Sequence, residues 1–188
     1  QHGDREAFVA PGERLTWRHI ERGARRMAAL LVSRGVKPGD HVGVLMPNCG
    51  RWVETFYACG LIGAVTVPIN TRFRTDELEY CLRQANVTTL VYLDRFLNID
   101  YTALLRAVEP AIDERLPGAK LPRLSQVFMA GEGPCPVAFE RLDDALARVP
   151  NEAAADVERR IAAVKADDVL LIQYTSGTTS FPKGVMLT

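Results

Sequence analysis

The sequence predicts an α/β fold, in which a mainly parallel sheet is covered by helices on both faces. The first observation is that short apolar runs alternate with segments of helical periodicity along much of the chain. The second is that these runs are continuous in Val, Leu and Ile, which is typical of strands buried on both faces. The length of 188 residues corresponds to one domain, or to one domain and part of a second.

A small hairpin and a long helix are predicted first. Residues 7–10 and 15–17 flank a Pro-Gly turn at positions 11 and 12. Thr16 is a suitable N-cap for a helix over residues 18–34, and Gly35 provides its stop. The apolar residues that recur on one face of this helix are Ile20, Ala24, Met27, Ala28 and Leu31.

Three strands and two helices are predicted over residues 39–93, and we expect the strands to share one mainly parallel sheet. The strands are expected at residues 41–46, 64–69 and 87–93. One helix follows the Pro47-Asn48 pair, and the spacing of its aromatic residues is that of a core helix: Trp52, Phe56 and Tyr57. The other helix begins at Thr75, with two acidic residues in its first turn.

The second half of the chain is less regular, especially over residues 98–148. Helices are predicted at residues 101–108 and 153–164, and strands at residues 126–130 and 169–174. A Gly/Pro loop is expected at residues 131–136.

Composition argues against several classes of protein. Lys plus Arg (23) equals Asp plus Glu (23), so nothing favours a nucleic-acid or anionic-membrane partner. The longest uncharged run, residues 55–71, is shorter than the ~20 apolar residues of a membrane span. The first residues lack the apolar core of a signal peptide, and the four cysteines form no CxxC pair. We therefore expect a cytoplasmic protein. No metal site is expected, because the histidines are scattered: His2, His19 and His41.

The motif that carries chemistry is TSGTTSFPKG, which follows the last predicted strand. Glycines let backbone N–H groups approach an anion, hydroxyls add donors without bulk, and a lysine supplies a positive charge for a polyphosphate. A loop at the carboxyl end of a strand in an open α/β sheet is also where such sheets bind ligands. The predicted phosphate-binding residues are Thr175, Ser176, Gly177, Thr178, Thr179, Ser180, Lys183 and Gly184.

Three other interpretations of this motif compete with a phosphate-binding loop. A Walker A loop does not fit, because Pro182 precedes the lysine and Gly184 follows it. Ser176 is not expected to be a covalent nucleophile, since it lies outside a G-x-S-x-G elbow. A plain solvated loop stays an alternative explanation of the composition, and the position of the lysine after an apolar strand favours a phosphate-binding loop over it.

Residues 174–188, YTSGTTSFPKGVMLT, closely resemble the phosphate-loop signature of the adenylate-forming superfamily, which includes acyl- and aryl-CoA synthetases. Ser180 stands where that family usually has Gly. A weaker match covers residues 39–92, with the family's Pro-Asn turn, GAV-x-VP-x-N strand end and DEL helix. The chain starts without Met and stops shortly after the loop, so we expect a fragment of a longer protein.

The resemblance implies that residues 1–188 are part of the large N-terminal AMP-binding domain, ending just after the phosphate loop, without the small C-terminal domain. It implies attack of a carboxylate, from a fatty or aryl acid, on Mg-ATP to give an acyl-adenylate, followed by thioester formation with CoA. ATP, Mg²⁺ and CoA are thus the implied cofactors. The departing pyrophosphate needs fixed donors and a cation, a role that maps onto the loop and Lys183.

Two alternatives stay open. One is an adenylation domain of a peptide synthetase, whose acceptor is the thiol of a carrier protein. The other is a noncatalytic phosphate-binding or interaction module that has kept the loop. In either case, we expect the 188-residue chain to be inactive by itself.

Overall fold

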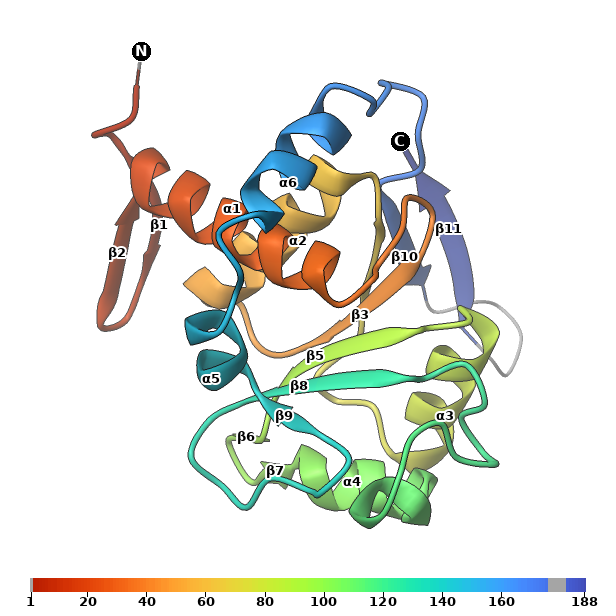
Figure 1. The fold of residues 1–188 in the computed structure, drawn as a ribbon. Coiled ribbons are helices and arrows are strands. Elements are labelled where there is room, and N and C mark those ends of the chain that lie inside the picture. The colour runs from red at the N-terminus through yellow and green to blue at the C-terminus, as the bar shows by residue number, and fades with distance from the viewer. Residues whose placement is uncertain (1, 176–181) are drawn as a thin grey trace.

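The computed structural model describes residues 2–175 and 182–188, and their fold is built on a seven-stranded sheet (Figure 1). The strand order is β11-β10-β4-β3-β5-β8-β9. The bounds of the strands are β3 (His41–Leu45), β4 (Val65–Pro68), β5 (Thr89–Leu93), β8 (Gln126–Ala130), β9 (Glu140–Arg141), β10 (Leu171–Thr175) and β11 (Lys183–Leu187). Each neighbouring pair is parallel except β10 and β11, which are antiparallel. The predicted fold class and the parallel strands of residues 39–93 are confirmed.

Helices cover both faces of the sheet (Figure 1). On one face lie α1 (Trp17–Ser33), α2 (Gly50–Ile62), α5 (Leu142–Ala147) and α6 (Ala153–Ile161). On the other lie α3 (Thr75–Gln84), α4 (Tyr101–Val108) and the short 3₁₀ helix η1 (Pro110–Asp113).

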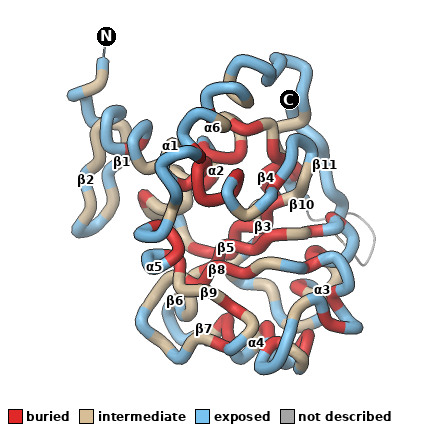
Figure 2. The backbone as a smooth tube through the Cα atoms, viewed as in Figure 1, coloured by how far each residue is buried: buried red, intermediate tan, exposed pale blue. Residues whose placement is uncertain are grey.

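The core follows the two-residue period of the strands. In β3, Val44 packs with the first group of helices and Leu45 with the second, and Val91 and Leu90 divide in the same way in β5. These side chains are at most 1% exposed, and the central strands are buried along most of their length (Figure 2). The continuous apolar runs in the sequence reflect this burial on both faces.

The N-terminal hairpin stands apart from the main sheet (Figure 1). Its strands, β1 (Glu6–Ala10) and β2 (Glu13–Thr16), are antiparallel. Thr16 then caps α1, since its side chain accepts a hydrogen bond from the backbone N–H of His19 at 3.4 Å. The predicted cap and helix are confirmed within a residue or two.

The sequence does not predict several of the short strands and helices. The strands β6 (Arg95–Phe96), β7 (Ile99–Asp100), β9 and β11 and the helix α5 were not predicted. Elements of two to six residues hold too few repeats for a periodic pattern to show. Helix α6 also ends at Ile161, three residues before the predicted end.

The aromatic residues of α2 do not lie fully in the core. Trp52 and Phe56 are half-buried, and Tyr57 is 40% exposed, so the expectation of a buried aromatic face is wrong for Tyr57. The buried face of α2 is formed by smaller residues, which pack closely against neighbouring elements: Thr55, Ala58, Cys59 and Ile62. The rings instead contact one another at the surface, with the Trp52 and Phe56 centroids 5.6 Å apart.

Among the residues that the structure describes, no helix is long and apolar enough to cross a membrane.

Candidate functional site

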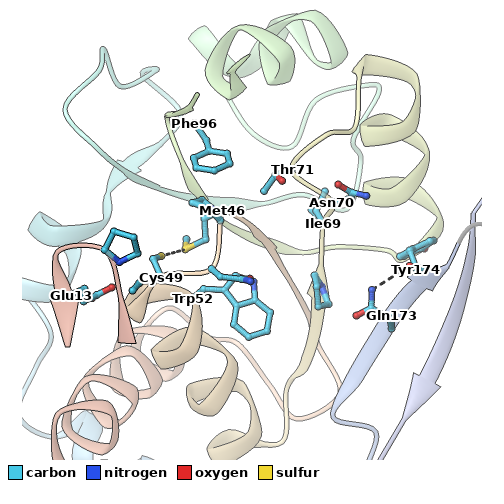
Figure 3. Close-up of a pocket in the computed structure, with 15 residues that line it drawn as sticks. Glu13, Met46, Cys49, Trp52, Ile69, Asn70, Thr71, Phe96, Gln173 and Tyr174 are labelled. Carbon is cyan, nitrogen blue, oxygen red and sulfur yellow. Dashed lines mark hydrogen bonds between the residues drawn. The ribbon is translucent and has the colours of Figure 1, made fainter. Parts of the chain in front are cut away.

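A cleft of about 810 Å³ opens at the carboxyl ends of β3, β4 and β10. This volume lies within the range of small-molecule binding sites. The cleft extends from Glu13 and Cys49, past Trp52, to Gln173 and Tyr174 (Figure 3). It therefore joins the N-terminal hairpin, the start of α2 and the hairpin that bears the predicted phosphate loop.

The topology of the sheet explains why the cleft forms here. From β3, the chain passes through α2 to β4 on one side, and then through α3 to β5 on the other side of β3. The carboxyl ends of parallel strands at such a reversal leave a crevice, which is where open α/β sheets bind ligands. Met46 follows β3 and Phe96 lies beyond β5, and both line the cleft.

The walls of the cleft combine polar and apolar groups. Amide and hydroxyl side chains come from Asn48, Asn70, Thr71 and Gln173. Apolar surface comes from Met46, Trp52, Ile69 and Phe96. Such a site can bind a molecule that has both an apolar and a strongly hydrogen-bonding part.

The segment after β4 is held in place by two hydrogen bonds. The side-chain oxygen of Asn70 accepts from the backbone N–H of Arg72 at 2.9 Å. The hydroxyl of Tyr101, on α4, donates to the backbone carbonyl of Thr71 at 2.8 Å. Burial raises the pKa of Tyr101, so this hydroxyl stays protonated and remains a donor.

The other end of the cleft is lined by the carboxylate of Glu13 and the thiol of Cys49, and Glu54 lies near Glu13 without lining the cleft. Burial raises the pKa of Glu54, and the negative charge of Glu13 adds to that effect, while Arg51 opposes it from 2.9 Å. Burial also raises the pKa of the Cys49 thiol, which lies 3.8 Å from the sulfur of Met46. Cys49 is thus a neutral thiol at neutral pH, not a nucleophilic thiolate.

Three of the predicted phosphate-binding residues lie within the described part of the chain. Thr175 ends β10, and its cross-strand partner is Lys183, the first residue of β11; Gly184 pairs with Tyr174. Thr175 and Lys183 are exposed. The others, residues 176–180, lie outside the described residues, and their roles stay predictions.

The hairpin and the cleft are connected through one face of β10. Residues two apart in a strand, such as Gln173 and Thr175, share a face, and directly opposed cross-strand partners do so as well. Lys183 therefore lies on the same face as Gln173, which lines the cleft. Neither Thr175 nor Lys183 lines the cleft itself.

Sequence reasoning missed most residues that form the cleft, including Trp52, Asn70 and Phe96. A usable signal was present for two of them. Asn48 and Asn70 come soon after predicted strands, and polar residues at the carboxyl ends of parallel strands are ligand-site candidates.

Comparison with known proteins identifies the family. The family model described as AMP-binding enzyme matches residues 1–188. The chain belongs to the AMP-binding enzyme family. The chain is 38% identical over 180 residues to a Rhodococcus jostii protein, 3-[(3aS,4S,7aS)-7a-methyl-1,5-dioxo-octahydro-1H-inden-4-yl]propanoyl:CoA ligase, with 95% of this chain and 33% of the relative covered. It is 32% identical over 197 residues to the mitochondrial medium-chain acyl-CoA ligase ACSF2 of Mus musculus, with 98% of this chain and 31% of the relative covered.

Solved structures agree with this assignment. The crystal structure of the anthranilate CoA ligase AuaEII in complex with anthranoyl-AMP matches with a TM-score of 0.81 and 25% identity. The match covers 98% of this chain and 32% of that one. The chain spans about a third of the length of the curated relatives that it matches.

Proposed function

We propose that the protein is an ATP-dependent carboxylate ligase, which forms an acyl-adenylate and then an acyl-CoA thioester. The observation that carries the proposal is the position of Lys183 and Thr175 on the hairpin face that continues, through Gln173, into the cleft. A cation and a hydroxyl beside a cleft of 810 Å³ fit a substrate that has a phosphate chain and a less polar remainder.

In this proposal, the residues of the chain bind and orient their substrates. Lys183 would place an ammonium group near the β- and γ-phosphates of ATP, and Thr175 would add a hydroxyl donor. Trp52, Met46 and Phe96 would exclude water from the less polar part of the bound molecule. Residues 1–188 would thus contribute one side of the active site, as part of the N-terminal AMP-binding domain.

Magnesium would be introduced by the nucleotide. Mg²⁺ is commonly bound through substrate phosphates and only one or two carboxylates. In residues 2–175 and 182–188, no group of three or more His, Cys, Asp or Glu side chains could hold a metal ion. We therefore assign no step to a metal ion held by this part of the chain.

The acid that is activated is, in this proposal, a fatty or aryl acid, in line with the names of the relatives. CoA is the proposed thiol for the same reason. A reducing compartment such as the cytoplasm fits the four cysteines, all of which are free in the structure.

The test uses the protein expressed at the full length that its gene encodes. Carboxylate-dependent exchange of pyrophosphate into ATP is measured with medium-chain fatty acids and with anthranilate, and thioester formation with CoA is followed by mass spectrometry. We expect exchange with at least one acid, and a thioester that requires CoA. The 188-residue chain, which spans a third of its relatives, should show no exchange.

Two results would favour the alternatives. An adenylate that is transferred to a carrier-protein thiol but not to CoA would identify a peptide-synthetase type of adenylation domain. Nucleotide binding without exchange for any acid would identify a noncatalytic module.

A further inference from the structure

The C-terminal half of β10 has few pairing partners in the sheet other than β11. Among the described residues, the register between β10 and β4 consists of one pair, Leu171 and Thr66. Beyond that pair β10 hydrogen-bonds along its ladder with β11, and β11 has no other neighbour in the described sheet. Thr175 ends β10 and Lys183 begins β11, so the position of this pair depends on contacts other than the pairing with β4.

The hydroxyl of Tyr174 makes such a contact, with helix α3. Its Oη donates a hydrogen bond to the side-chain oxygen of Gln84, the last residue of α3. The ring packs partly buried against the core on that side of the sheet. Burial raises the pKa of Tyr174, so the hydroxyl remains a donor at any physiological pH.

Gly184 lets β11 pack closely against Ile172 and Tyr174 of β10. The two residues are cross-strand partners, and a Cβ at Gly184 would lie 3.4 Å from Cζ of Tyr174 and 2.9 Å from Cγ2 of Ile172. The distance to Ile172 is too short for a real Cβ, so any larger residue would push β11 away from Ile172 and thus from β10, whereas the distance to the Tyr174 ring is an ordinary contact. The glycine thus lets β11, and with it Lys183, lie close against β10.

We propose that Tyr174 is a positioning residue. Its hydroxyl, hydrogen-bonded to Gln84, and its ring, packed against Gly184, hold Thr175 and Lys183 in position for contact with the nucleotide phosphates. This assignment rests on the proposed function. It adds a role for α3, which lies on the opposite face of the sheet from α2 and contributes no residue to the cleft.

The test is a double-mutant cycle in the full-length protein, with Tyr174→Phe, Gln84→Leu and the two combined. Each single variant should raise the KM for ATP about three- to tenfold, as expected for the loss of one hydrogen bond, and leave the KM for the carboxylate within about twofold. The double variant should be no worse than the worse single variant, because both remove the same bond. Gln84→Glu keeps a side-chain oxygen as an acceptor, so its KM for ATP should stay close to that of the wild type.

The matched control is Tyr57→Phe, which removes the hydroxyl of an exposed tyrosine on α2, and it should change neither KM. Equal increases in both KM values, or effects of the two single variants that multiply in the double variant, would overturn the proposal. So would an unchanged KM for ATP in Tyr174→Phe.

A second measurement separates this proposal from the proposed function. Hydrogen–deuterium exchange over residues 171–175 and 183–188, without nucleotide, should be faster in Tyr174→Phe and Gln84→Leu than in the wild type and in Tyr57→Phe. If the wild-type protein has no ligase activity but exchange is still faster in the two variants, the ligase function is rejected and the positioning role of the Tyr174–Gln84 hydrogen bond is kept. Unchanged exchange in the two variants would reject the positioning role of this hydrogen bond, whether or not the protein has ligase activity.

Discussion

The carboxylate of Glu13 accepts a hydrogen bond from the backbone N–H of Gly50 at 2.8 Å. Glu13 lies on β2 and Gly50 is the first residue of α2, so the N-terminal hairpin caps a helix of the main domain. In this position the Glu13 carboxylate occupies space that a Cβ at residue 50 would fill, because that Cβ would lie 2.3 Å from it. Cys49, at the N-cap position, makes no side-chain capping bond, and Glu13 takes over that role.

Replacement of this cap should lower stability. We expect Glu13→Ala to reduce the free energy of unfolding by about 1 kcal/mol, the usual effect of losing an N-cap acceptor. The measurement is urea unfolding at neutral pH. Glu152→Ala is the matched control, since Glu152 stands at the N-cap of α6 without a capping bond, and it should change stability by less than about 0.5 kcal/mol. Equal losses in the two variants would contradict the capping role.

The stability contribution of Glu54 should depend on pH. Its side chain is 16% exposed, and burial raises its pKa above the ordinary value of 4.5. Because the folded state holds the proton more tightly than the unfolded state, this contribution is present below pH 4.5 and is lost as the pH rises through the raised pKa. Glu54→Gln should therefore gain in stability relative to the wild type between about pH 4 and pH 7. Denaturant unfolding at both pH values checks this, and a constant difference would contradict it.

The four thiols should differ in reactivity. Burial raises the pKa of Cys59 and of Cys81 to about 12, and both side chains are buried. A maleimide at about pH 8 should label only Cys49 and Cys135 in the native protein, as read by mass spectrometry, and all four in denaturant. A ligand in the cleft should slow labelling of Cys49 and not of Cys135, which does not line it. Equal protection of both would place the ligand elsewhere.

Lys183 should matter for the use of ATP. In the full-length protein, Lys183→Ala should weaken ATP use by about 1.5–3 kcal/mol, the value of a charge-assisted hydrogen bond. Transfer from a supplied acyl-adenylate to the thiol should change far less, because the phosphates have then departed. Lys37→Ala is the control, since Lys37 is exposed in the turn before β3. Equal losses in both half-reactions would argue against contact with the phosphates.

Much of the fold could be predicted because the central strands are buried on both faces. After a polar first residue, the strands β3, β5 and β8 are largely apolar, and the starts of α1 and α3 have clear signals in Thr16 and in the acidic first turn. The edge of the sheet could not be predicted. Strand β11 is exposed throughout and, within the described part of the chain, pairs only with β10, so its residues carry no burial pattern.

The candidate site was predicted only in part, for a related reason. The TSGTTSFPKG motif is contiguous, and its chemistry is visible in the sequence. The cleft is assembled from segments that are far apart, such as Glu13, Asn70 and Gln173, and which of them meet depends on the strand order. The contact between Tyr174 and Gln84 joins two elements 90 residues apart, and no local pattern indicates it.

The pairing of β10 with β4 also bears on how the chain folds. Strands β3, β4 and β5 lie close together in sequence, whereas β10 returns to β4 only after about a hundred residues. Closing a long loop costs entropy before any contact is gained, so nearby pairs form more readily. We expect β3, β4 and β5 to assemble early and the β10–β11 hairpin to dock last. The residues proposed to hold phosphate would then reach their places only in the final stage of folding.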